Sequence, residues 1–170
     1  RSRPSQSLFK LNNRTDTLGL EPEYGLARVL VERFAELPGK TLMLYSKGAS
    51  VDHLVGLEHR GHTVASFTLT PAPIALHLEA GAPPPAARIA ALAKLWRAGF
   101  PTRVRLSPIV PIRGWRETYA ALLDELFTAA TPELVTLWTL SMIDVEELGR
   151  IVPLGEMDKD IVAASVAASD

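Results

Sequence analysis

Hydroxyl and amino side chains stand at or near the ends of several apolar runs, where they could bind a charged ligand. Lys47 directly follows the run TLMLYS, Thr68 lies near the end of TVASFTLT, and Thr15 follows SLFKL. Ser107 interrupts a further apolar run, RVRLSPIVPI. An ammonium among hydroxyls suits a ligand that bears a carboxylate and a ribose, although a lone lysine in such a place is as often simply solvated. The residue types alone indicate a binding crevice and no particular reaction.

The other side chains and motifs that could carry out chemistry do not indicate a particular reaction. His59 and His62 flank a glycine in the segment EHRGHT, where we expect turn-satisfying imidazoles and no metal site. The sequence has no cysteine, so these residues cannot hold an iron-sulfur cluster or a thiol nucleophile. It also contains no G-x-G-x-x-G, P-loop or G-x-S-x-G motif, which removes the usual grounds for dinucleotide, P-loop or hydrolase chemistry.

Composition and charge exclude several further classes. With 47% hydrophobic residues and a net charge of -1 among 170 residues, the chain is neither disordered nor a disulfide scaffold. The near-zero charge removes the overall attraction that non-specific nucleic-acid binding needs, so only a local patch could supply it. We expect no membrane span and a cytoplasmic protein. The densest basic group, a candidate for contact with DNA, is Arg103, Arg105, Arg113 and Arg116, with Trp115 among them.

Apolar runs alternate with helical patterns along the chain, which predicts an α/β fold. Strands separated by helices imply right-handed crossovers and a parallel sheet with its ligands at the carboxyl ends of the strands. About five such repeats are too few for a closed eight-stranded barrel, so a partial barrel and an open doubly wound sheet both remain. The predicted strands cover residues 8–11, 41–46, 63–70, 103–110 and 134–140. The predicted helices cover residues 21–37, 50 or 52 to 60, 86–98, 114–127 and 144–150.

The ordered set of motifs resembles spore photoproduct lyase and its radical S-adenosylmethionine relatives. The resemblance runs from about Leu8 to about Ile143, and it implies a partial (β/α) TIM barrel with parallel strands and helices outside. We expect this barrel part to span residues 1–153, with a tail at 154–170. The matching segments are NRTDTLGLE at 13–21, LYSKGASVDHL at 44–54, LEHRGHT at 57–63, FTLT at 67–70, RIAALAKLWRAGFP at 88–101 and SPIVPIRGWRETY at 107–119.

The resemblance also implies roles for particular residues. Thr15, Lys47 and Thr68 match positions that help to hold S-adenosylmethionine, with Lys47 on the methionyl carboxylate, and Ser107 matches a strand near the adenine. Asn13 stands where the spore enzymes carry the cysteine that returns a hydrogen atom to the substrate radical. An amide is a poor hydrogen-atom donor, so strict reversal of the spore photoproduct is in doubt.

The family's C-x3-C-x2-C loop, which holds a [4Fe-4S] cluster, is absent from the sequence. Truncation of the first βα unit is the simplest explanation, and the bare chain is then expected to be inactive. The resemblance implies DNA photoproduct repair by a 5′-deoxyadenosyl radical in the completed enzyme. Two alternatives stay open: a non-catalytic nucleotide-binding or nucleic-acid-associated remnant that has lost the cluster loop, and a soluble α/β domain that shares only the architecture.

Overall fold

A single sheet of five parallel strands organises the protein. The computed structural model describes residues 5–11, 15–19, 21, 23–139, 149–150 and 152–167. The strands follow one another in sequence order, β1-β2-β3-β4-β5, and each pairs in parallel with the next. This confirms the predicted parallel α/β fold, and the sheet is open, as a partial barrel requires. The strands are β1 Leu8–Leu11, β2 Thr41–Ser46, β3 Thr63–Thr68, β4 Thr102–Ile109 and β5 Leu134–Thr139.

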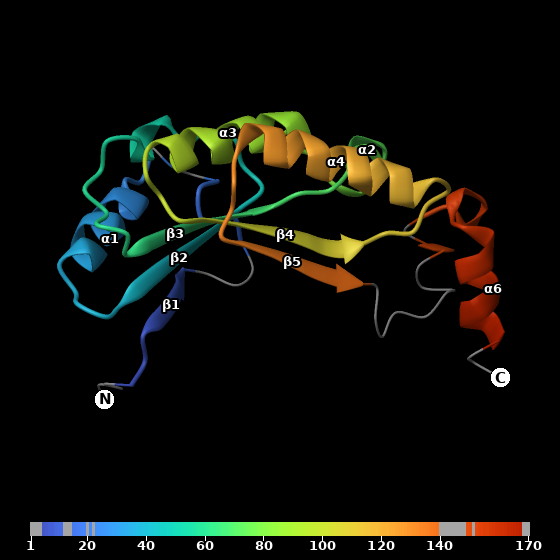
Figure 1. Cartoon of the computed structure of the whole chain (residues 1–170), viewed down its shortest axis with the longest axis horizontal. Helices are drawn as coiled ribbons and strands as arrows, with labels where there is room; N and C mark the ends of the chain where they lie inside the picture. Colours follow the sequence, from blue (N-terminus) through green and yellow to red (C-terminus); the bar gives the residue numbers. More distant parts are fainter. Residues whose placement is uncertain are drawn as a thin grey trace.

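The helices that connect the strands cover one face of the sheet. Figure 1 shows α3 and α4 lying above the strands, with no described segment across the opposite face. The strands follow in sequence order, so every right-handed crossover runs in the same direction and places its helix on the same face of the sheet. The helices are α1 Leu26–Ala35, α2 Ala72–Leu78, α3 Pro85–Arg97, α4 Trp115–Ala129 and α6 Lys159–Ala167.

Alternation along the strands separates an apolar layer from a polar one. Leu44, Phe67 and Val104 lie on the helical side and are at most 1% exposed. Their neighbours Tyr45 and Arg105 lie on the opposite, uncovered face, because successive strand residues point to opposite sides. The core therefore lies between the sheet and the helices, and the uncovered face carries polar and charged groups.

One predicted helix is wrong. The segment from residue 50 or 52 to 60 forms only a single 3-10 turn, η1, at Asp52–Leu54. Val55 is extended and Gly56 has a φ of +86°, so the chain turns away before a second helical turn can form. The segment is a loop that leads into β3.

Helix α1 buries only part of its apolar surface. Ala27, Val31 and Ala35 are buried, and Leu30 and Phe34 pack against the same core in partly buried positions. Leu26 and Val29 are 49% and 61% exposed, so they lie outside this contact. The helix also begins at Leu26 and not at Glu21, after Gly25 in the left-handed conformation.

Residues near the carboxyl terminus pack onto the end of the sheet. Val152 and Met157 are buried, and Met157 forms an antiparallel bridge with Ile112. The predicted helix at 144–150 lies outside the described residues except for its last two positions, and the division between 1–153 and 154–170 stays a prediction. In the part of the chain that is described, no helix has the length and apolar character needed to cross a membrane.

Candidate functional site at the carboxyl edge of the sheet

The four residues predicted to bind the cofactor lie at the carboxyl ends of four neighbouring strands. Thr15 follows β1, Lys47 directly follows β2, Thr68 ends β3, and Ser107 lies near the end of β4. Because the four strands are parallel and adjacent, these ends form one edge of the sheet. The four positions therefore share one edge of the sheet, but Thr15 and Lys47 line two different cavities, and neither cavity includes Thr68 or Ser107. Their role toward a ligand stays a prediction.

Asp16 ties the segment after β1 to the end of β2. Its Oδ1 accepts hydrogen bonds from the Leu18 amide at 2.9 Å and the Ser46 hydroxyl at 2.8 Å. Its Oδ2 accepts one from the Lys47 amide at 2.6 Å. Gly48 donates to the Ser46 hydroxyl, and a Cβ at Gly48 would lie 3.0 Å from that oxygen. The backbone that carries Lys47 is therefore closely held, with little room for a larger residue beside it.

A buried carboxylate, Glu79, lies at the centre of a second polar network at the same edge. Its Oε1 lies 2.6 Å from the Lys47 ammonium and accepts a hydrogen bond from the Thr70 hydroxyl at 3.0 Å. Its Oε2 lies 2.6 Å from Nη1 of Arg88 in α3. The Glu79 side chain is 7% exposed and that of Arg88 is 0% exposed, whereas that of Lys47 is 43% exposed. The network runs from the protein interior to the surface, and Lys47 is its outer end.

Arg88 extends this network to β3. Its Nε donates to the Pro83 carbonyl at 2.7 Å, and its Nη1 donates to the Thr68 carbonyl at 3.2 Å. Burial works to raise the pKa of Glu79, but the hydrogen bonds and charges of Lys47 and Arg88 together outweigh it and hold that pKa below its ordinary value. Glu79 is thus an anion at neutral pH, paired with two cations.

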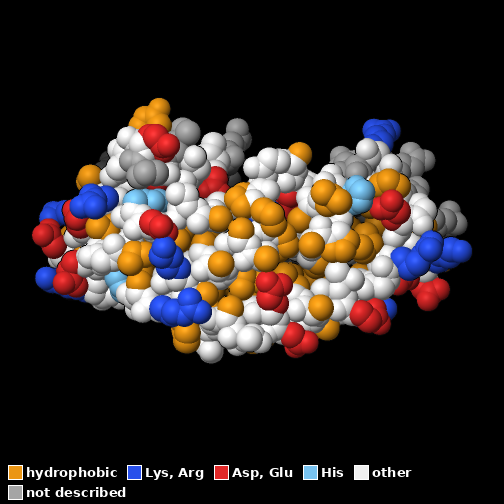
Figure 2. All heavy atoms as spheres, turned by 90° about the horizontal axis from the view of Figure 1, so that it is seen from above, with side chains coloured by type: hydrophobic (Ala, Val, Ile, Leu, Met, Phe, Trp, Pro, Cys, Tyr) orange, Lys and Arg blue, Asp and Glu red, His pale blue; other side chains and the backbone are white. Residues whose placement is uncertain are grey.

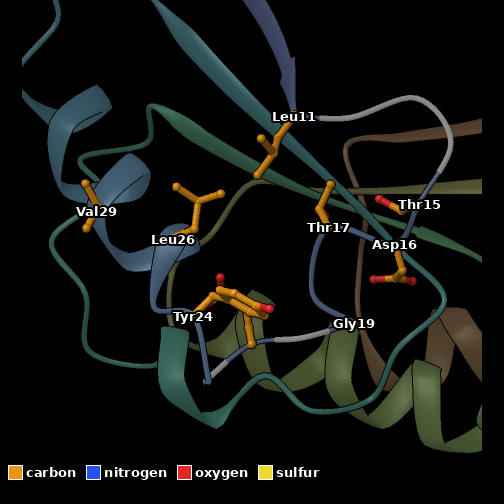
Figure 3. Close-up of a pocket in the computed structure, with 9 residues that line it drawn as sticks. Leu11, Thr15, Asp16, Thr17, Gly19, Tyr24, Leu26 and Val29 are labelled. Carbon is orange, nitrogen blue, oxygen red and sulfur yellow. The ribbon is translucent and has the colours of Figure 1, made fainter.

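Two cavities adjoin this edge and differ in character. One, of about 640 Å³, lies between the loops after β1, β2 and α2, and Asp16, Lys47 and Gly48 line it together with Gly81. The other, of about 680 Å³, is mainly apolar. Figure 3 shows Leu11, Tyr24, Leu26 and Val29 on one side of it, and Thr15 and Asp16 on the other. The two cavities share Asp16, Gly19 and Glu21 as lining residues.

His59 satisfies a turn, as predicted, whereas His62 contacts a residue far away in the sequence. His59 accepts a hydrogen bond from the Gly61 amide at 3.0 Å and stacks on Phe100. His62 has its Nδ1 2.8 Å from the Phe34 carbonyl. Within the described ranges, no group of three or more His, Cys, Asp or Glu side chains could hold a metal ion.

The basic residues predicted as a DNA patch fall into two separate groups. Arg103 and Arg105 lie in β4; the first pairs with Glu133 at 2.6 Å and the second lies 5.2 Å from the centre of the Tyr45 ring. The other two arginines and Trp115 lie beyond the end of β4 or at the start of α4. Arg113 donates to the Gly155 carbonyl, and Arg116 lies over the ring of Trp115. Asn13 lies outside the described residues.

Sequence reasoning missed the central pair of the site. Neither Glu79 nor Arg88 follows a strand, so the rule that ligands gather at strand ends does not find them. A signal was nevertheless present for Arg88, because it lies beside Ile89 and one turn before Leu92 on the face of α3 that packs in the core. A charged residue on an apolar helix face needs a buried partner of opposite charge.

Comparisons with known proteins agree with this architecture. The family model for spore photoproduct lyase matches residues 1–146. Spore photoproduct lyase from Bacillus subtilis (strain 168) is 28% identical over 130 residues, which cover 76% of this chain and 38% of the relative. The corresponding protein from Geobacillus sp. (strain Y412MC61) is 26% identical over 123 residues, which cover 72% of this chain and 36% of that protein.

Solved structures give the same result. Spore photoproduct lyase complexed with dinucleoside spore photoproduct matches 75% of this chain and 38% of its own length, with 25% identity and a TM-score of 0.70. A variant with bound AdoMet and dinucleoside spore photoproduct matches 94% of this chain and 49% of its own length, with a TM-score of 0.76; its 22% identity supports the fold alone. The chain therefore spans between a third and a half of the length of these relatives. Since the family model covers most of the sequence, the chain belongs to the spore photoproduct lyase family.

Proposed function

We propose that this chain forms the S-adenosylmethionine-binding part of a radical enzyme of the spore photoproduct lyase type, which acts on DNA. Membership of the family and the common position of Thr15, Lys47, Thr68 and Ser107 at one sheet edge support the proposal. The single observation that carries it is the half-exposed ammonium of Lys47 beside a cavity of about 640 Å³ at that edge. Parallel sheets bind their ligands in this place.

The residues present fit S-adenosylmethionine. A lysine ammonium has three N–H donors, and at Lys47 one of them is directed to Glu79, which leaves donors for a ligand carboxylate. Gly48 lines the cavity with its backbone, and a Cβ at this position would lie 3.0 Å from the Ser46 hydroxyl oxygen. In this proposal Lys47 binds the methionyl carboxylate, Thr15 and Thr68 bind polar groups of the ribose or amino acid, and Ser107 lies near the adenine.

The residues present do not fit the iron-sulfur cluster. Its ligands are cysteine thiolates, and the 170 residues contain no cysteine. A C-x3-C-x2-C segment must therefore come from outside these residues if the protein is to cleave its cofactor. When bound and reduced, S-adenosylmethionine supplies a 5′-deoxyadenosyl radical. In this proposal the role of the chain is to bind the cofactor, orient it and exclude water from it.

The open face of the sheet supports DNA as the partner. Lys10 and Arg105 lie 4.4 Å and 5.2 Å from the centre of the Tyr45 ring. Trp138 is 56% exposed and lines the same cavity as these three residues. Cations and aromatic rings together bind the phosphates and bases of a nucleic-acid strand. Figure 2 shows the helical side for comparison, where apolar side chains occupy the middle of the surface and Lys and Arg side chains gather toward its two ends.

A second candidate function is a non-catalytic nucleotide-binding or nucleic-acid-associated remnant. The observation that favours it is Asn13 at the position of the family's hydrogen donor. An amide lacks the weak S–H bond of a thiol, so Asn13 does not supply the hydrogen-atom donor that the family carries at this position. Both candidate functions include a nucleotide-binding site. Only the enzyme cleaves S-adenosylmethionine.

Anaerobic reconstitution distinguishes the two candidates. The chain is joined to the polypeptide encoded upstream of Arg1, loaded with iron and sulfide, reduced with dithionite, and assayed for 5′-deoxyadenosine. The enzyme proposal predicts bound iron and 5′-deoxyadenosine, both lost without the upstream segment, and cleavage reduced in Lys47→Ala. Nucleotide binding without cleavage in the extended chain would favour the remnant.

A further inference from the structure

The pairing of Lys47 with a buried carboxylate is not what a freely solvated lysine at a strand end would show. Glu79 comes from the end of α2 and Lys47 from the end of β2, so the ion pair joins two separate elements. The Glu79 side chain is 7% exposed, and burying a carboxylate costs free energy unless cations and donors surround it. Arg88 and Thr70 supply that environment, and Lys47 is the only exposed member of the described network.

We propose that Glu79, fixed in place by Arg88, is a positioning residue that sets the Lys47 ammonium for binding the carboxylate at the amino-acid end of S-adenosylmethionine. This inference rests on the proposed function and assigns a role to two residues that no strand-end rule identifies. It predicts that the site distinguishes a complete cofactor from a bare nucleoside.

The geometry supports positioning for two reasons. First, a lysine side chain has four rotatable bonds and loses considerable entropy when it is ordered, so an ammonium already held 2.6 Å from Glu79 binds a ligand at lower entropic cost. Secondly, the net charge of the Lys47, Glu79 and Arg88 side chains favours binding of an anion. Lys47 and Arg88 carry two positive charges around the single negative charge of Glu79, so one further carboxylate neutralises the group.

The same network fixes the strand that carries Thr68. The Arg88 guanidinium bonds to both Glu79 and the Thr68 carbonyl. Two residues proposed to contact the cofactor, from two different strands, are thereby linked through one buried pair. A purely structural pair would not need to extend to the half-exposed Lys47.

The test compares two nucleosides that differ at the amino-acid end. S-adenosylhomocysteine carries the carboxylate, whereas 5′-methylthioadenosine lacks it. Their affinities are measured by calorimetry for the 170-residue chain and for Glu79→Gln, Lys47→Ala and the double variant. Asp52→Asn, which removes the carboxylate of an exposed 2.6 Å ion pair with Lys94, is the control.

If Glu79 acts through Lys47, Glu79→Gln weakens S-adenosylhomocysteine binding by about ten-fold and leaves 5′-methylthioadenosine binding unchanged. In the Lys47→Ala background the same substitution has no further effect on either ligand. Asp52→Asn changes neither affinity. Because the buried Arg88 could prevent Glu79→Gln from folding, Glu79→Gln combined with Arg88→Met serves as a second variant, in which both buried charges are gone.

Four results would overturn the inference. Equal loss for both ligands would make Glu79 a structural residue, and a further loss in the Lys47→Ala background would mean that Glu79 touches the ligand itself. Unchanged discrimination in Glu79→Gln, together with lost discrimination in Lys47→Ala, would refute positioning and leave the proposed function intact. If the parent chain binds neither ligand, the proposed function fails together with this inference.

Discussion

Two neighbouring cavities at the carboxyl end of the sheet differ in the side chains that line them. One is lined by polar and charged groups with partners, and the other, the apolar groove beside α1, is lined mainly by exposed apolar side chains. Around Lys47, the two carboxylates have partners within the described residues: the exposed Asp16 accepts three hydrogen bonds, and the buried Glu79 is paired with two cations. Nη2 of Arg88 is buried there without a hydrogen-bond partner. Hydrogen bonds and ion pairs within the chain hold the polar site in place.

In the groove beside α1, the apolar side chains of Tyr24, Leu26 and Val29 are 74%, 49% and 61% exposed. We expect the exposed side chains of the apolar groove to contribute little to the stability of the protein.

The largest effect is expected where the polar site is most deeply buried. Arg88→Ala leaves Glu79 buried without its inner cation and should lower the free energy of unfolding by about 3–5 kcal/mol. Lys94→Ala, which removes an exposed ion pair with Asp52, should cost less than about 1 kcal/mol. Urea unfolding followed by circular dichroism measures both. Similar small losses in the two variants would erase the distinction between a buried and a surface network.

Lys47 should matter for binding more than for stability. Its side chain is 43% exposed, so Lys47→Ala should change the free energy of unfolding by less than about 1 kcal/mol. Loss of a hydrogen bond between charged groups should nevertheless weaken S-adenosylmethionine binding by about 1.5–3 kcal/mol. Calorimetry and thermal melting on the same preparation test this, and a variant that melts early yet binds normally would contradict it.

Two valines on one helix sharpen the contrast with the apolar groove. Val31 is 0% exposed in the core, whereas Val29 is 61% exposed and lines the groove. Val31→Ala removes two buried methyl groups and should cost about 2 kcal/mol, and Val29→Ala should stay within about 0.5 kcal/mol. Equal costs, measured by urea unfolding, would mean that the groove is covered in solution.

The smallest effect is expected from pH. The pKa of Glu79 is lowered in the folded chain because the bonds and charges of Lys47 and Arg88 outweigh the opposing effect of burial. The unfolded chain then takes up the proton first, so this stabilisation is complete above the ordinary value of 4.5 and is lost as the pH falls through the lower, folded-state pKa. In Glu79→Gln, stability should depend less on pH in this acidic range. An unchanged pH profile from urea unfolding would contradict the charge assignment.

Local patterns predicted most of the fold because each strand is a short apolar run closed by turn residues. All five strands appear where their sequences indicate, within about two residues at either end. The failure at residues 50–60 has a local cause that the pattern hides, since Gly56 takes a positive φ that ends any helix. On α1, Ala27, Val31 and Ala35 form the buried face, whereas the apolar residues Leu26 and Val29 are exposed.

The candidate site was predictable only in part, for a physical reason. Lys47 and Thr68 follow from the rule that parallel strands gather ligands at their carboxyl ends. Glu79 and Arg88 belong to α2's end and α3, and their pairing depends on how those two elements pack above the sheet. Such a long-range pair leaves only an indirect sign in the sequence, a charged residue on an apolar helix face.

A crystal structure of the chain with S-adenosylhomocysteine tests the central claim most directly. The account predicts that the ligand occupies the cavity between the loops after β1 and β2. Its carboxylate should lie within hydrogen-bond distance of the Lys47 ammonium, which should keep its contact with Glu79. A ligand seated in the apolar groove beside α1, or a Lys47 side chain turned away from the bound carboxylate, would contradict it.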